Sequence, residues 1–173
     1  MRDKNKNYAP IVENVKSCLV ELGLSVDDEI NEKDTVKFIN GIKDNDIEMF
    51  IEVSCQADIV KIKVSPNLAF EVLEAEPFYR LLNEMNLRLM DIGHFSINVT
   101  DQTVLLQTSL DLSDDDFNRE QMMTTIKRIS MQGLELFKLL QEMFLGDQCP
   151  FDLLYSYIEE MRENRVSNEK TFH

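Results

Sequence analysis

Three segments between residues 36 and 64 alternate apolar and polar side chains, and this period of two limits what the chain can fold into. Successive side chains of a strand point to opposite faces, so each segment predicts a strand with one apolar face. Turn-forming residues separate the segments, which favours antiparallel hairpins. The apolar positions are Val36, Phe38 and Ile42, then Ile47, Met49, Ile51 and Val53, then Val60, Ile62 and Val64.

The register of these hairpins follows from keeping their apolar side chains on one face. Closing the first hairpin at residues 44–45 predicts the pair Phe38–Ile51, and closing the second over residues 55–58 predicts Ile51–Ile62 and, on the opposite face, Glu52–Lys61. A further hairpin over residues 95–112 carries the same alternation. Closing it at residues 101–102 predicts Ile97 opposite Leu106, although position 102 lacks the glycine that a tight turn prefers, so this turn can be looser.

Asn40 is the polar exception on the apolar face. Two explanations remain open: a buried amide that is hydrogen-bonded, or a bulge at Gly41 that changes the alternation.

Apolar residues at steps of three and four predict helices over residues 10–22, 77–89 and 122–144, with a last short helix over 151–161. Gly23 follows the first helix and favours a left-handed cap. The acidic stretch 25–34 has no pattern and reads as a connection. Ser113 to Asp116 offer acceptors and negative charge at the start of the third helix. We expect the chain to fray between the last helix and residue 173.

The predicted order is α-βββ-α-ββ-α with an extra C-terminal helix, which is an α+β fold with an antiparallel sheet packed by helices. We expect one domain over residues 1–146, with the helix and tail of residues 147–173 packed on it or extending from it. An apolar fraction of 43%, including 10 Phe and 9 Met, is sufficient for a core in a chain of 173 residues.

The charge balance argues against a nucleic-acid or membrane partner. With 32 acidic and 18 basic residues the formal charge is −14, so the average surface repels phosphate. The basic residues Arg2, Lys4 and Lys6 lie in a short tail, and such tails are typically solvated. We find no signal segment and no apolar run near the roughly 18 residues of a membrane span, so we expect a cytoplasmic protein.

Residues for nucleophilic catalysis are sparse. One of the two histidines is the last residue, His173, and His94 lies on the face opposite the core. Cys18 lies on the apolar stripe of the first helix and is expected to be buried. Cys55 falls in a predicted turn, where it is either structural or exposed and reactive.

Metal and cofactor sites are also not expected. Three widely spaced cysteines, the third being Cys149, suit neither a disulfide framework nor a zinc site. The run Asp114 to Asp116 lacks the alternating ligands of an EF-hand and fits a helix cap better. With no glycine-rich phosphate loop, we expect no cofactor and no enzyme activity. An enzyme with an unrecognised pair of carboxylates remains the alternative.

The order of elements and three segments resemble the type III secretion chaperone-like fold, and within it the YbjN-like bacterial regulators. The segments are Ile47–Val53, Pro77–Leu82 and Gly93–Phe95 with Val104–Leu110. The resemblance covers about residues 8–144 and implies a homodimer that binds a segment of another protein. It carries over no functional residue.

The alternation places four apolar side chains on the face of the sheet opposite the core. They are a candidate protein-interaction surface: Ile39, Phe50, Ile59 and Leu105. Exposed together they would form a patch that something should cover. Three covers are open: the chain's own C-terminal helix, a second copy, or a segment of another protein. The function expected is therefore a chaperone-like or regulatory protein-binding module, with a subunit of a larger complex as a further alternative.

Overall fold

A computed structural model describes residues 9–27, 29–32, 35–44, 47–56, 59–67, 75–98, 100–112 and 117–170. Within them the helices are α1 (Ala9–Glu21), α2 (Ala75–Arg88), α3 (Arg119–Leu145) and α4 (Pro150–Lys170). The strands are β1 (Glu29–Glu32), β2 (Thr35–Asp44), β3 (Ile47–Gln56), β4 (Ile59–Pro66), β5 (His94–Asn98) and β6 (Thr103–Asp111). The predicted α+β class is confirmed.

The strands form one six-stranded antiparallel sheet in the order β1-β2-β3-β4-β6-β5. The prediction of a plain connection over residues 25–34 is wrong, because β1 lies within it. Ion pairs hold this acidic strand: Glu29 pairs with Lys16 of α1 at 2.7 Å, and Glu32 pairs with Lys37 of β2 at 2.7 Å. Charge pairing thus replaces the apolar alternation that a strand of this sheet otherwise shows.

The predicted faces of the hairpins are confirmed, but the predicted partners are wrong by two residues in each hairpin. A shift of two residues leaves every side chain on its face, so the alternation alone cannot detect it. The position of the turn sets the register. The third hairpin closes in a looser turn than the two-residue turn at 101–102, and Gln102 in this turn has φ 52°. The predicted pairs are Phe38–Ile51, Ile51–Ile62, Glu52–Lys61 and Ile97–Leu106. The structure instead pairs Phe38 with Val53, Ile51 with Val64, Glu52 with Lys63 and Ile97 with Val104.

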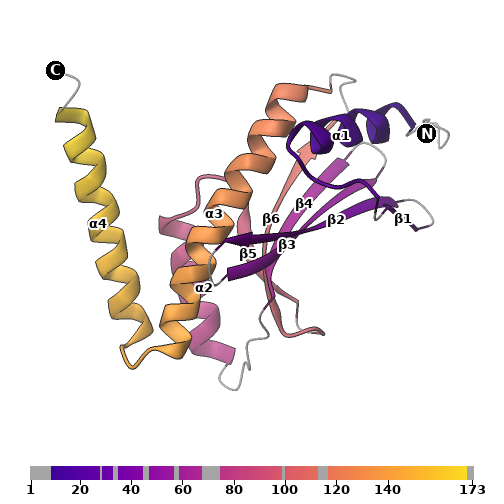
Figure 1. Ribbon diagram of the computed structural model, residues 1–173. Coiled ribbons are helices and arrows are strands. Elements are labelled where there is room, and N and C mark those ends of the chain that lie inside the picture. Colours follow the sequence, from indigo (N-terminus) through magenta and orange to yellow (C-terminus); the bar gives the residue numbers. More distant parts are fainter. Residues whose placement is uncertain are drawn as a thin grey trace, which may run out of the picture.

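All four helices contribute to one core on a single face of the sheet (Figure 1). Helix α3 crosses β3, β4 and β6, while α1 packs beside α3 and α2 packs against β5. Helix α4 packs on α2 and α3, where it buries Leu154 and Ile158. The C-terminal helix therefore does not cover the other face of the sheet. It also extends to Lys170, well beyond the predicted short helix, while the division of the chain at residue 146 stays a prediction.

The helix ends follow ordinary capping chemistry. Gly23 has φ 74°, and the bonds from Gly23 N to Val20 O and from Leu24 N to Leu19 O form the predicted left-handed cap of α1. The start of α3 differs from the prediction, since its N-cap is Asn118, whose side chain accepts from Gln121 N at 2.9 Å. The residues 113–116 predicted to cap this helix lie outside the described residues.

Two asparagines each bind both backbone groups of one distant residue. Asn40 accepts from Ser25 N at 2.6 Å and donates to Ser25 O at 3.0 Å, so the predicted buried amide is confirmed and β2 continues through Gly41 without a bulge. Asn86 of α2 accepts from Phe95 N at 2.6 Å and donates to Phe95 O at 3.1 Å. The Asn86 amide thus provides hydrogen-bond partners for backbone groups on the outer edge of β5. Unpaired backbone groups at the edge of a sheet can otherwise pair with a strand of another molecule.

We predict that Asn86→Ala destabilises the fold while Asn83→Ala does not. Both residues lie on α2 and gain the same helix propensity on substitution, but Asn83 is exposed and only Asn86 binds Phe95. Loss of two hydrogen bonds should lower the free energy of unfolding by about 1–3 kcal/mol relative to Asn83→Ala. Urea unfolding followed by circular dichroism measures this difference. Equal midpoints for the two variants would show that the amide does not fasten β5 to α2.

Candidate protein-interaction face of the sheet

The outward face of the sheet is defined here as the strand side chains that point away from the helices. In β3 these are the even-numbered residues from Glu48 to Gln56, and in β2 and β4 the odd-numbered residues. No helix of the described residues packs on this face. The four apolar side chains that alternation assigns to the face opposite the core belong to strands β2, β3, β4 and β6 of this face.

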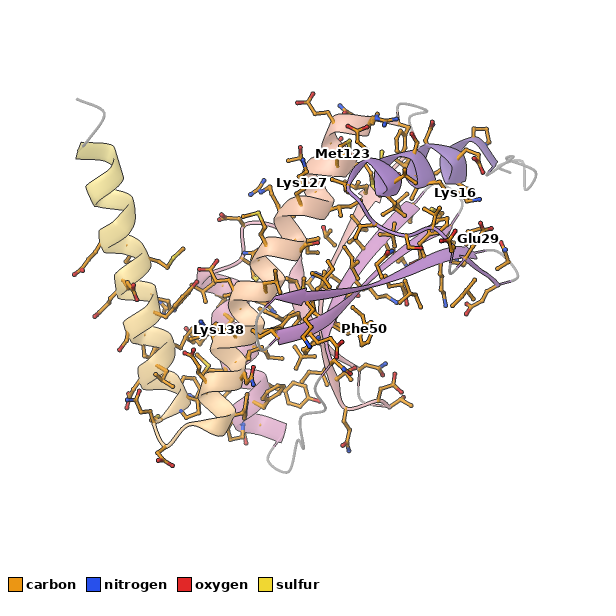
Figure 2. The ribbon with its side chains drawn as sticks, viewed as in Figure 1. Lys16, Glu29, Phe50, Met123, Lys127 and Lys138 are labelled. Atoms are coloured by element: carbon orange, nitrogen blue, oxygen red, sulfur yellow. The ribbon has the colours of Figure 1, made fainter. Side chains whose placement is uncertain are left out.

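Phe50 is an aromatic side chain of the outward face (Figure 2), and it is 38% exposed. It lies opposite Gly41 of β2 and Ser65 of β4. A Cβ added to Gly41 would be 3.9 Å from Phe50 Cε1, so the aromatic ring rests against the bare backbone of the neighbouring strand. The observed register brings these two residues together, whereas the predicted pair Phe38–Ile51 would place Phe50 opposite Ile39.

The structure brings only some of the four predicted residues together. Ile39 lies opposite Glu52, diagonally next to Phe50, and is half-buried. Leu105 lies opposite Ser96 on β5, with β4 between it and Phe50. Ile59 is 39% exposed at the other end of the face, opposite Gln56 and Asp111. The apolar side chains therefore flank a polar centre and do not form one continuous patch.

The polar centre consists of side chains that pair with each other. Lys63 and Glu52 form a salt bridge at 3.0 Å, and Ser54 Oγ donates to Glu52 at 3.3 Å. His94 Nε2 and Gln107 Nε2 are 3.1 Å apart, which places the histidine on the face expected for it. At the edge, the Glu32 carboxylate raises the pKa of Lys37 through a hydrogen bond. The face is thus prepared for contacts with both apolar and charged groups.

The cysteines differ from the sequence expectation at one position. Cys55 lies in β3 and not in a turn, is 5% exposed, and burial raises its pKa to about 12. Burial also raises the pKa of Cys18, whereas Cys149 is exposed. A reactive Cys55 is therefore wrong, because a protonated and buried thiol is a poor nucleophile. Among the described residues, no group of three or more His, Cys, Asp and Glu side chains is placed to hold a metal ion.

We predict that a maleimide or a disulfide reagent at pH 8 labels Cys149 rapidly in the folded protein, and labels Cys18 and Cys55 only after unfolding. The exposed thiol of Cys149 is accessible to the reagent, whereas burial raises the pKa of Cys18 and Cys55 and shields both thiols. Mass spectrometry of labelled peptides over time gives the rates, with Cys149→Ser as the control. Fast labelling of Cys55 in the folded variant would contradict the burial of β3.

Comparisons with known proteins agree with the fold and leave the face unassigned. The model of the YbjN family, described as "Putative bacterial sensory transduction regulator", matches residues 12–142. No curated protein matches the sequence. A crystal structure of an uncharacterized protein from Methanothermobacter thermautotrophicus is similar in fold, with a TM-score of 0.54 and 16% identity over 76% of this chain and 97% of that chain. In the part of the chain that is described, no helix is long and apolar enough to span a membrane.

Proposed function

This chain belongs to the YbjN family, and on that premise we propose that it is a non-enzymatic protein-binding module, chaperone-like or regulatory, that acts as a homodimer on a segment of another protein. The observation that carries the proposal is the outward face. In the described part of the chain, the six-stranded sheet has helices on one side, and its other side presents partly exposed Phe50 and Ile59. Soluble proteins normally cover such a face or use it for binding.

The charge of the outward face supports a second copy as one occupant. The described strand residues on this face include as many lysines as carboxylates, so the face is formally neutral in a chain of net charge −14. The average surface of one copy repels that of another, and a neutral face is where two acidic copies meet with the least repulsion. The charged residues are Lys37, Lys43, Lys61, Lys63, Glu32, Glu48, Glu52 and Asp111.

The size of the outward face is adequate for a stable contact. Strands about 4.8 Å apart with a rise of about 3.4 Å per residue give six strands of this length a projected area on the order of 650 Å². A standard interface buries about 800 Å² on each partner, so a stable contact would need the whole of the face. A mixture of aromatic, aliphatic and paired charged groups is also the usual composition of an interface.

We predict that Phe50→Asp weakens self-association and that Tyr79→Asp does not. Tyr79 is the matched control, since it is a 46% exposed aromatic on α2, on the helical side of the sheet. Loss of this aromatic anchor should raise the dimer Kd by roughly 30-fold or more, about 2 kcal/mol. Sedimentation equilibrium over a range of concentrations measures this Kd.

The urea midpoint of each variant, measured at low concentration, shows whether the fold is intact. A wild-type protein that stays monomeric at high micromolar concentration would contradict the homodimer. Equal dimerisation of Phe50→Asp and wild type would instead contradict the role of the outward face. If another protein occupies the face in place of a second copy, a pull-down should lose that protein with Phe50→Asp and retain it with Tyr79→Asp.

A further inference from the structure

Two neighbouring cavities lie on the helical side of the sheet, at the end where β5 stops pairing with β6. The first, of about 550 Å³, lies between the first half of α3 and the β6 residues Thr108 and Leu110. The second, of about 230 Å³, lies between α3, the end of α2 and α4. Both are lined by Asp91, Ile92 and Arg128, so they adjoin along these residues.

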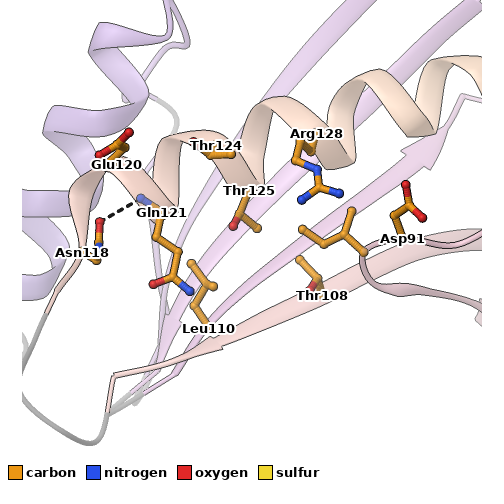
Figure 3. A pocket seen from close by; sticks show the side chains of 10 residues that line it. Asp91, Thr108, Leu110, Asn118, Glu120, Gln121, Thr124, Thr125 and Arg128 are labelled. Atoms are coloured by element: carbon orange, nitrogen blue, oxygen red, sulfur yellow. Dashed lines mark hydrogen bonds between the residues drawn. The ribbon is translucent and has the colours of Figure 1, made fainter. Parts of the chain in front are cut away.

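The shared rim of the cavities carries opposite charges. Arg128 extends from α3 and its guanidinium faces the carboxylate of Asp91, which comes from the segment between α2 and β5 (Figure 3). A guanidinium binds a carboxylate through two parallel hydrogen bonds. Asp91 also has a contact within the protein, but a carboxylate accepts more than one hydrogen bond. The rim can therefore bind a molecule that has both a carboxylate and an ammonium group.

A buried acceptor lies in the wall of the second cavity. Gln132 lines this cavity and donates from Nε2 to Leu89 O at 3.0 Å. This bond fixes the orientation of the amide, because the reversed amide would place two oxygens against each other. Gln132 Oε1 is then buried without a hydrogen-bond partner in the described part of the chain. A buried acceptor without a donor is unfavourable, and because Gln132 Oε1 has almost no accessible surface, an N–H group in the cavity would reach it only if the wall opens.

The remaining wall of the second cavity is mostly apolar. It is formed by side chains from α3, α4 and the end of α2, and its volume lies below the roughly 300–1,000 Å³ of pockets for drug-sized ligands. The ligand is therefore small and has an apolar part. Methionine side chains adapt their shape to such ligands. The apolar lining residues are Leu89, Ile92, Met131, Leu136 and Met161.

We propose that these cavities bind a free α-amino acid with an apolar side chain. Arg128 binds its carboxylate, Asp91 accepts from its ammonium group, and its side chain lies between Leu136 and Met161. This binding goes beyond the proposed protein-binding function and does not depend on it. The bound ligand would contact both α3 and α4, and these two helices otherwise meet through few side chains such as Tyr157, which donates to Glu135.

The proposal is tested by isothermal titration calorimetry with free leucine and methionine. N-acetyl-leucine lacks the ammonium group and leucinamide lacks the carboxylate, so each should bind more weakly by roughly tenfold or more, the loss expected for one charge-assisted pair. Leucine that fails to bind at millimolar concentrations, or leucinamide that binds equally well, would overturn the proposal.

The protein variants give a second, independent readout. Arg128→Met should weaken leucine binding by roughly tenfold or more, because a charge-assisted pair is lost. Lys127→Met is the matched control, since Lys127 is an exposed cation next to Arg128 on α3 that lines neither cavity. Both residues are exposed, so both variants should keep the urea midpoint of the wild type. Equal leucine affinity of the two variants would overturn the assignment of Arg128.

Discussion

At Gly133, helix α3 lies directly against β4, and the layered arrangement of the molecule depends on this contact. A Cβ at this position would be 3.1 Å from Val64 Cγ1, closer than the roughly 3.5–4.0 Å at which carbon atoms pack. The absent side chain lets a helix of 27 residues lie across the middle of the sheet. Arg119 at its start binds Ser17 and Glu21 of α1, and its later turns support α4. All helices are thereby placed on one face.

The outward face is the direct consequence of this one-sided packing. Burying the apolar residues of α1, α2 and α4 against α3 and the inner face leaves no described helix to cover the opposite side of the sheet. Two contacts fix side-chain positions on that face: the salt bridge between Lys63 and Glu52, and the contact of Phe50 with Gly41. Because the face is neutral while the chain is strongly acidic, we propose it as the surface on which copies of the protein associate.

The sequence predicted the faces of the sheet well, and predicted its pairing less well. Alternation decides whether Ile51 points inward, but Val64 and Ile62 satisfy it equally as partners, so the register depends on turn positions that several polar residues can occupy. Strand β1 was not predicted, because it is stabilised by ion pairs such as Lys16–Glu29 and lacks the apolar alternation used to find strands (Figure 2). The same uncertainty about the turns is the reason that the sequence placed Cys55 in a turn, although it is buried in β3.

The candidate sites show the same limit. The alternation of side chains along the strands is enough to assign Phe50 and Ile59 to the outward face. The position of α4 could not be predicted in this way, because its apolar stripe could pack on either side of the sheet. The cavities beside Arg128 had no sequence signal. Their lining comes from the segment between α2 and β5, from β6, from α3 with the residue before it, and from α4, and only the tertiary structure brings these together.

The most direct test of the central claim is the distance between two copies of a spin label on the outward face. Lys61→Cys in a Cys149→Ser background places the label between Ser54 and Ser109, while the buried Cys18 and Cys55 stay unlabelled. Association through this face predicts strong dipolar broadening between labels at Lys61→Cys, and none between labels at Lys127→Cys on α3. Broadening only at the α3 position, or at neither position in a protein that is dimeric by sedimentation, would contradict the account.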